Sequence, residues 1–208
     1  MATGSEGGAT LTPQQVLDGL KDGNSRYVEG KSVHPNLDSA RREATAKDGQ
    51  HPNVTILSCS DSRVPVELLF DQGIGDVFVV RVAGNVCNVD EAGSIEYGVD
   101  HVGTPLLVVL GHSGCGAVTA VTMDAELHGN VAPLVAGIRP AVVRAKKEHP
   151  ELHGKDLVPA AIEANVRQSI DDLLKISPVV RERVKDGKLK VVGALYDLKS
   201  GKIRWLGE

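Results

Sequence analysis

Two cysteines and one histidine have the residue types and the spacing of a metal site. Cys59 follows the apolar run 54–57, whereas His112 and Cys115 follow a second apolar run at 106–110. Both runs have the length and composition of buried strands. If these strands are neighbours in one parallel sheet, both loops leave at its carboxyl edge, where open α/β sheets bind ligands. The pattern then brings two thiols and one imidazole to the same place.

Two thiolates and an imidazole suit zinc, because a catalytic zinc site uses three protein ligands and keeps a fourth position open. Two thiolates also cancel the formal charge of Zn²⁺, so the ion lowers the pKa of bound water less than one held by three neutral histidines. The alternative is that Cys59 and Cys115 are ordinary buried thiols, since free cysteine is among the most buried residue types. Their joint position beside His112 favours the metal site.

Asp61 and Arg63 lie in the loop after the first run and could compensate for a weak electrophile. Along an extended loop alternate side chains point the same way, so the two can pair and Arg63 can keep Asp61 ionised. An ionised carboxylate only accepts hydrogen bonds, so Asp61 could hold the proton of a zinc-bound hydroxide and aim its lone pair at a substrate. Two alternatives stay open: an ordinary surface ion pair, or Asp61 binding zinc itself.

The second loop, 111–116, reads Gly-His-Ser-Gly-Cys-Gly before an expected helix. It could be a phosphate cradle, but it has neither the Gly-Lys-Ser/Thr ending of a P-loop nor the Gly-x-Gly-x-x-Gly fingerprint. We expect its glycines to let the backbone turn around a metal and to donate N–H groups to the sulfurs. Cys87 has no zinc partner nearby in sequence and is expected to be a structural thiol.

Alternating strands and helices from residue 54 onward would position these loops. Strands are predicted at 54–58, 76–81, 106–110 and 189–195, and helices at 66–70, 91–102, after 116 and over most of 133–176. Near-continuous apolar strands are typical of a parallel sheet covered on both faces. Thr12, Pro13 and Gln15 are a helix start, a second short helix is expected at 36–48, and a turn at 199–202 predicts a hairpin. We therefore expect an α/β fold: a mostly parallel central sheet flanked by helices, with N-terminal helices and a hairpin-like C-terminal edge.

Length and composition set the protein class. The 208 residues fit one domain, expected at 11–208 after a disordered tail at 1–10. A net charge of −4 with interspersed signs argues against nucleic acid as a partner. No apolar stretch is long enough for a membrane span, and the first ten residues do not resemble a secretory signal. Three cysteines far apart do not suggest a disulfide framework, so we expect a cytoplasmic protein.

Four motifs carry a resemblance to a known family. They are Cys-Ser-Asp-Ser-Arg at 59–63, Gly-Asp-Val-Phe-Val-Val-Arg at 75–81, Ser-Ile-Glu-Tyr at 94–97 and Gly-His-Ser-Gly-Cys-Gly at 111–116. In this order and spacing they resemble the β-class carbonic anhydrases, and the clear match runs from about residue 50 to residue 121.

The resemblance implies a function and assigns the site residues. It implies reversible hydration of CO2 to bicarbonate and a proton, through a hydroxide on one Zn²⁺ per chain. The implied residues are Cys59, His112 and Cys115 as zinc ligands, Asp61 and Arg63 as a catalytic dyad, and Gln50, Phe78 and Tyr97 as substrate-binding residues. The family builds this pocket between two subunits, which implies a homodimer or a dimer of dimers. Without the resemblance, Gln50 would be a loop residue, Phe78 a core residue and Tyr97 a helix-face residue.

Three rival hypotheses stay open. The first is hydrolysis of CS2 or carbonyl sulfide, which relatives with this fold perform. The second is a non-catalytic zinc scaffold, which would keep only the zinc ligands. The third is a redox thiol protein, which would pair Cys59 with Cys115 as a disulfide. One subgroup of the family also has an inhibitory bicarbonate site that uses a tryptophan three residues before the first cysteine ligand. Ile56 stands there instead, so we expect Asp61 to pair with Arg63 and not with the metal.

Overall fold

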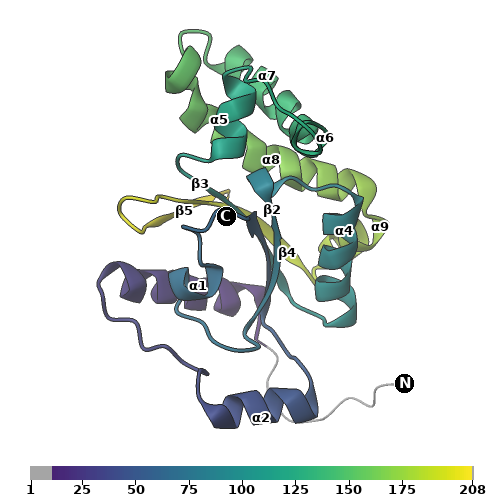
Figure 1. Cartoon of the computed structure of the whole chain (residues 1–208). Helices are drawn as coiled ribbons and strands as arrows, with labels where there is room; N and C mark the ends of the chain where they lie inside the picture. The colour runs from purple at the N-terminus through teal and green to yellow at the C-terminus, as the bar shows by residue number, and fades with distance from the viewer. Residues whose placement is uncertain (1–10, 208) are drawn as a thin grey trace.

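A five-stranded sheet forms the centre of the molecule in a computed structural model that describes residues 11–207 (Figure 1). The strands are β1 (Val54–Cys59), β2 (Val77–Val82), β3 (Leu106–His112), β4 (Lys190–Tyr196) and β5 (Ile203–Leu206). Their order across the sheet is β2-β1-β3-β4-β5. The first four strands are parallel to one another and β5 is antiparallel to β4. The expected parallel sheet with a hairpin-like C-terminal edge is therefore confirmed.

Helices cover both faces of this sheet, and Figure 1 shows α5, α7 and α8 on one side and α1 on the other. The helices are α1 (Pro13–Val28), α2 (Ser39–Asp48), α3 (Val66–Leu69), α4 (Val89–Glu96), α5 (Gly116–Thr122), α6 (Val131–Leu134), α7 (Arg139–Glu148), α8 (Val158–Ile176) and α9 (Pro178–Lys185). Short turns of tighter or wider helix are η1 (Ala83–Asn85), η2 (Tyr97–His101), η3 (Val135–Ile138) and η4 (Gly154–Leu157).

The alternation of side chains along the central strands divides the core in two. Leu57 and Val109 pack in the cluster under α8, whereas Ile56 and Val108 pack in the cluster under α1. Every residue of β1 and β3 is buried, as the continuous apolar runs predict for strands covered on both faces. Because burial on both faces fixes the register of these two strands, the ends of β1 and β3 are held side by side.

The helix starts show which local signals the sequence provides. Thr12 accepts from the backbone of Gln15 while the Gln15 side chain accepts from Thr12, with Pro13 at the first position, so the expected start of α1 is confirmed. Helix α9 was not predicted. It begins with the same chemistry, because the Ser177 hydroxyl accepts from the backbone N–H of Val180 and Pro178 follows the cap.

Two predictions concern the chain as a whole. Among residues 11–207, no helix is both long and apolar enough to span a membrane. The tail expected at residues 1–10 lies outside the described residues.

Candidate metal centre

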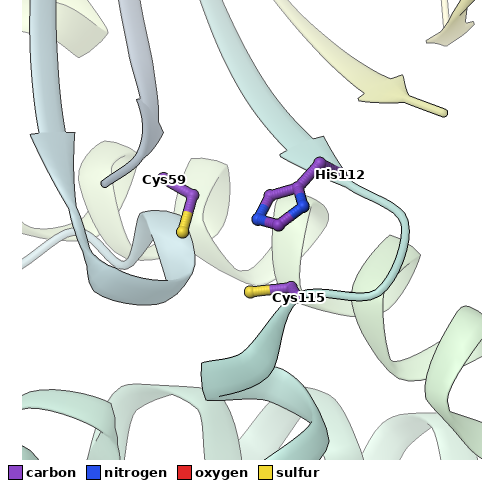
Figure 2. Close-up of side chains that lie close together, drawn as sticks. All are labelled: Cys59, His112 and Cys115. Carbon is purple, nitrogen blue, oxygen red and sulfur yellow. The ribbon is translucent and has the colours of Figure 1, made fainter. Parts of the chain in front are cut away.

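The ends of β1 and β3 bring the three expected ligands together (Figure 2). Cys59 is the last residue of β1 and His112 is the last residue of β3, its neighbour in the sheet. Cys115 precedes the first residue of α5. One donor atom from each residue lies within 4.8 Å of the other two, and all three residues are buried. This is the cluster predicted from the sequence, at the predicted edge of the sheet.

The His112 ring is prepared to accept a metal through one nitrogen. Its Nδ1 lies 3.0 Å from the carbonyl oxygen of Ser113, which only accepts, so Nδ1 carries the proton. The Nε2 atom is then unprotonated and is buried without a hydrogen-bond partner in the described chain. A buried polar atom normally has a partner, and a second-shell carbonyl on the other ring nitrogen is typical of metal-binding histidines. The donor set of Cys59, His112 and Cys115 therefore fits Zn²⁺.

The two thiols have opposite pKa shifts. The neighbouring Cys115 thiol, together with the backbone N–H groups of Gly84 and Asp61, lowers the pKa of Cys59 to about 4. The neighbouring Cys59 sulfur, together with burial, raises the pKa of Cys115 far above that of a free thiol. A bound dication would displace the remaining thiol protons, because a metal takes up thiolates and not thiols.

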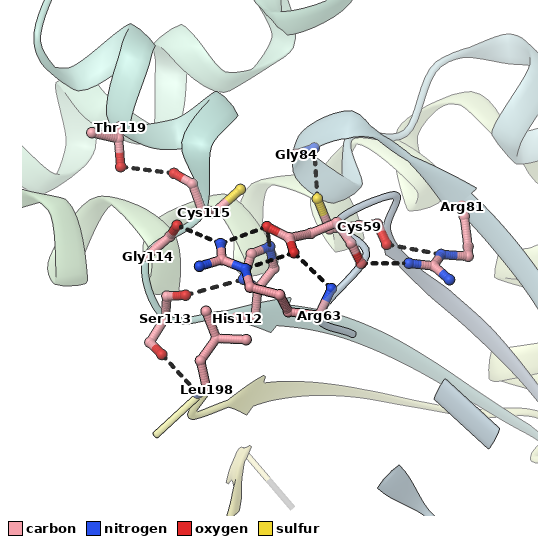
Figure 3. Close-up of polar contacts among 11 residues, drawn as sticks. Cys59, Arg63, Arg81, Gly84, His112, Ser113, Gly114, Cys115, Thr119 and Leu198 are labelled. Atoms are coloured by element: carbon pink, nitrogen blue, oxygen red, sulfur yellow. Dashed lines mark hydrogen bonds and ion pairs between the residues drawn. The ribbon is translucent and has the colours of Figure 1, made fainter. Parts of the chain in front are cut away.

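The backbone donors around the sulfurs differ from those expected. The Gly84 N–H donates to Cys59 Sγ at 3.3 Å, from the turn η1 that follows β2 (Figure 3). The N–H groups of Ala117 and Val118, in the first turn of α5, act on the Cys115 sulfur. The glycines of loop 111–116 were expected to supply these donors, and that expectation is wrong. Backbone N–H groups in the first turn of a helix have no partner within the helix and are free to donate. Gly111, in contrast, lies in the β3 ladder and pairs with β4.

Asp61 and Arg63 form the expected ion pair, but in a tight turn and not along an extended loop. The Val64 N–H bonds the Asp61 carbonyl at 3.0 Å and closes the turn. Arg63 Nε and Nη2 donate to the two carboxylate oxygens at 2.9 and 2.7 Å, and the Arg63 backbone N–H donates to Oδ1 at 2.9 Å. These bonds, led by the guanidinium, hold the pKa of Asp61 well below its usual range. Its Oδ2 lies 3.8 Å from His112 Nε2, so an ionised acceptor stands beside the candidate metal position.

Both loops are held in place by groups on neighbouring strands (Figure 3). Arg81 on β2 donates to the carbonyl oxygens of Cys59 at 3.0 Å and Asp61 at 2.7 Å. Beyond β4, the Leu198 N–H donates to Ser113 Oγ at 2.9 Å, and the Ser113 N–H donates to the Tyr196 carbonyl at 2.8 Å. The sequence reasoning gave Arg81 no place in the site. The available signal was that Arg81 is the one charged residue of the otherwise apolar strand β2. It pairs in register with Ser58 of β1.

The three expected substrate-binding residues lie away from the candidate metal ligands of their own chain. Gln50 is exposed and precedes β1, at the opposite end of the strand from Cys59. Phe78 pairs in register with Thr55, near the start of the sheet, and its ring lies 6.0 Å from that of Tyr97, which is 51% exposed. Strand β1 alone spans roughly 15–20 Å. One chain therefore does not bring Gln50 to the ligand cluster.

The remaining candidate groups have the surroundings expected of them. Cys87 is buried, and burial raises the pKa of its thiol to about 12. The other histidines are exposed or half-buried: His34, His51, His101, His128, His149 and His153. None of them belongs to a cluster of metal-binding side chains in the described part of the chain.

Comparison with known proteins gives one consistent family. The family model described as carbonic anhydrase matches residues 54–203. Carbonic anhydrase 2 of Mycobacterium tuberculosis is 38% identical over 194 residues, covering 91% of each chain. A carbonic anhydrase of Mycolicibacterium smegmatis is 37% identical over 196 residues, covering 92% of each.

Solved structures agree with this match. A β-carbonic anhydrase of Aspergillus fumigatus superposes with a TM-score of 0.73 at 29% identity, covering 93% of this chain and 89% of that one. One of two tetrameric β-carbonic anhydrases from Sordaria macrospora has the same fold, with a TM-score of 0.74 at 24% identity, covering 93% and 98%.

Proposed function

The chain belongs to the β-class carbonic anhydrases, and from this premise we propose that it catalyses the reversible hydration of CO2 to bicarbonate and a proton. The observation that carries the proposal is the convergence of three metal-ligating atoms within 4.8 Å beside an ionised, acceptor-only carboxylate. The proposed ligands of one Zn²⁺ per chain are Cys59, His112 and Cys115. Zinc, when bound, supplies a nucleophile at neutral pH by lowering the pKa of water.

Asp61 is the proposed orienting group. Its carboxylate can only accept hydrogen bonds, so it holds the proton of the attacking oxygen and leaves a lone pair directed at the carbon of CO2. Arg63 donates to both carboxylate oxygens of Asp61. Its Nη2 also donates to the carbonyl oxygen of Gly114 in the second loop, at 3.4 Å. This bidentate bond keeps the carboxylate ionised and fixes its plane. With both of its oxygens bonded to Arg63, Asp61 would not serve as a metal ligand.

A second copy of the chain is proposed to complete the substrate pocket. Strand β2 is an edge strand with β1 as its neighbour, and a groove of about 310 Å³ follows it past Phe78 and Arg81. Tyr97 leaves half of its side chain exposed beside Phe78, on the same flank. An exposed aromatic beside an edge strand is typical of surfaces that another chain covers. In a homodimer, or a dimer of dimers, Gln50 of one subunit would orient CO2 at the metal of the other.

The setting of the enzyme is proposed to be a reducing cytoplasm. Cys59, Cys87 and Cys115 are free thiols, and two of them must stay reduced to bind zinc. We propose residues 11–208 as one catalytic domain, because both core clusters are built on the same five-stranded sheet.

Stopped-flow CO2 hydration by the purified protein, with zinc quantified in the same sample, tests the proposal. We expect rapid hydration and no comparable hydrolysis of CS2 or carbonyl sulfide. Hydrolysis of either sulfur compound without CO2 hydration would assign the site to another substrate. Zinc-bound protein that is inactive on all three would indicate a scaffold, and a Cys59–Cys115 disulfide without zinc would indicate a redox protein.

A further inference from the structure

A chain of two hydrogen bonds connects helix α8 to the sulfur of Cys59. Asn165 Nδ2 donates to the carbonyl oxygen of Gly84 at 2.7 Å, and the Gly84 N–H donates to Cys59 Sγ at 3.3 Å. Both bonds meet on the same residue, in the turn η1. Among the described residues, the Asn165 side chain makes no hydrogen bond to any of the expected metal ligands. Its side chain therefore acts on Cys59 only through the backbone of Gly84.

Gly84 depends on bonds of this kind for its position. Its φ angle is +77°, which side-chain-bearing residues rarely adopt. A Cβ atom on this residue would lie 2.8 Å from Ile138 Cδ1 and 3.1 Å from Ala117 Cβ, so a larger residue here would strain the backbone and displace the Ile138 side chain. Because Gly84 has no side chain to pack, its backbone hydrogen bonds set the direction of the N–H group that points at Cys59.

The burial of Asn165 argues that its amide serves more than packing. The residue is 1% exposed, and its Oδ1 has no hydrogen-bond partner among residues 11–207. A buried amide with one half unsatisfied costs folding free energy, which a leucine of similar size would avoid. The bond to Gly84 is what the amide offers and a leucine cannot. That bond leads directly to a candidate metal ligand.

We propose that Asn165 is a positioning residue for the metal centre, which fixes η1 so that the Gly84 N–H stays bonded to the Cys59 sulfur. The proposal rests on the proposed function in one respect, that Cys59 is a zinc ligand. A thiolate that accepts an N–H bond is held in one orientation and donates less electron density to the metal. Outer groups of this kind orient the ligands and tune the affinity of a site.

Ser169 provides a matched control on the next turn of α8. Its hydroxyl lies 2.9 Å from the carbonyl oxygens of both Asn85 and Asn165, so it binds the same turn η1 one residue further from Cys59 and leaves the Asn165 side chain free to bond Gly84. It is as buried as Asn165, at 2% exposure. Loss of Ser169 loosens the same segment without removing the bond to Gly84. Comparing the two substitutions therefore separates a general effect on η1 from a specific effect through Gly84.

The test is the metal affinity of Asn165→Leu and Ser169→Ala, measured by chelator competition against zinc. We expect Asn165→Leu to weaken zinc binding by about 10- to 100-fold, and Ser169→Ala to leave it unchanged. In cobalt-loaded protein, Asn165→Leu should shift the thiolate-to-cobalt charge-transfer band to lower energy, because the sulfur lone pair loses its N–H donor. Equal affinities for Asn165→Leu and the wild type, or equal losses in both variants, would overturn the proposal.

Two further measurements keep the result interpretable. Thermal unfolding of the metal-free variants shows whether Asn165→Leu still folds, and Asn165→Ala replaces it if it does not. In wild-type protein loaded with ¹¹³Cd, the Gly84 amide proton should show a scalar coupling to the metal across the N–H···S bond. Absence of this coupling would overturn the proposal without any variant. If wild-type protein binds no metal, the proposed function fails, whereas normal metal binding with no Asn165 effect contradicts only the positioning role.

Discussion

The two ends of strand β1 differ in how much of a site one chain assembles. At the carboxyl end, Cys59 meets His112 and Cys115 within 4.8 Å, with Asp61 fixed beside them. At the amino end, Gln50 is exposed in a loop, and the rings of Phe78 and Tyr97 lie 6.0 Å apart near the start of the sheet. The first group is complete in a single chain, and the second is not.

This difference follows from how each group is positioned. Parallel pairing of β1 with β3 fixes the candidate metal ligands, because both strands are buried and their register is strongly specified. Gln50 and Tyr97 lie on the surface, where only a partner could add contacts. The comparison teaches that metal binding should survive in a monomer, whereas catalysis should depend on assembly.

The largest effect is expected at the carboxyl end. Cys115→Ser should remove most of the bound zinc and all CO2 hydration, because a neutral hydroxyl is a far poorer ligand than a thiolate. Zinc content and stopped-flow hydration on one sample measure both. Cys87→Ser is the control, since that buried thiol lies outside the cluster, and it should retain both. Full zinc occupancy in an active Cys115→Ser protein would refute the ligand assignment.

The second effect separates orientation from metal binding. Asp61→Asn should keep the zinc and lower kcat by about 100-fold or more, because the amide is uncharged and can donate where an acceptor is needed. The low pKa of Asp61 keeps it ionised across the working range, so the wild-type pH profile should contain no inflection from this group. An unchanged kcat in the variant would mean that Asp61 does not orient the nucleophile.

The third effect tests the amino end and the second copy together. Gln50→Ala should lower kcat/KM by about 10- to 100-fold, as expected for one lost hydrogen bond to substrate. Gln50→Ala and Cys115→Ser chains, unfolded and refolded in equal amounts, should form mixed dimers that each contain one intact site. The mixture should then recover about a quarter of wild-type activity.

The mixing experiment has a clear opposite outcome. If Gln50 acts on the metal of its own chain, every site in the mixture carries one defect, and activity stays at the sum of the two separate variants. The same result together with a fully active monomer in sedimentation would refute the two-copy pocket.

Much of the carboxyl end could be predicted from the sequence, and the reasons are physical. Continuous apolar runs and the polar residues directly after them gave the strands, their parallel pairing and the ligand cluster. The N-cap of α1 was also readable, but the equivalent signal at Ser177 and Pro178 was overlooked because it follows a long helical region. An extended loop was predicted at Asp61 and Arg63, where the structure has a tight turn. Both conformations place the two side chains on the same side of the backbone, so the predicted ion pair does not distinguish them.

The contacts that hold the site could not be predicted, because they join residues distant in sequence. Gly84 reaches Cys59 across 25 positions, and Asn165 reaches Gly84 across 81. No spacing in the chain indicates such bonds. They depend on where α8 crosses the sheet, which only the packed fold determines.

The smallest effect concerns acid stability of the segment that leads to Gln50. Asp71 is buried and binds Arg26 at 2.6 Å and the N–H groups of Val33 and His34, between α1 and α2. Burial alone would raise the pKa of Asp71, but these bonds outweigh it and lower the pKa. Its contribution to stability is therefore complete above the unfolded pKa, about 4, and is lost as the pH falls through the lower folded value.

Urea unfolding between pH 7 and pH 3 measures this contribution. Asp71→Asn should be less stable than the wild type at pH 7 by about 1–3 kcal/mol, and the gap should shrink as the pH falls below 4. Glu43→Gln, on the exposed surface of α2, should show no such gap. A gap that stays constant down to pH 3 would mean that the charge of Asp71 is not what stabilises the segment.

The most direct test of the account is a zinc titration of the metal-free, fully reduced protein, with the CO2 hydration rate measured at each step. The account predicts that the rate rises in proportion to bound zinc and stops rising at one zinc per chain. It also predicts that removal of the zinc by a chelator abolishes hydration and that fresh zinc restores it. Hydration that does not depend on zinc, or a chain that binds one zinc and stays inactive as an assembled oligomer, would contradict the account.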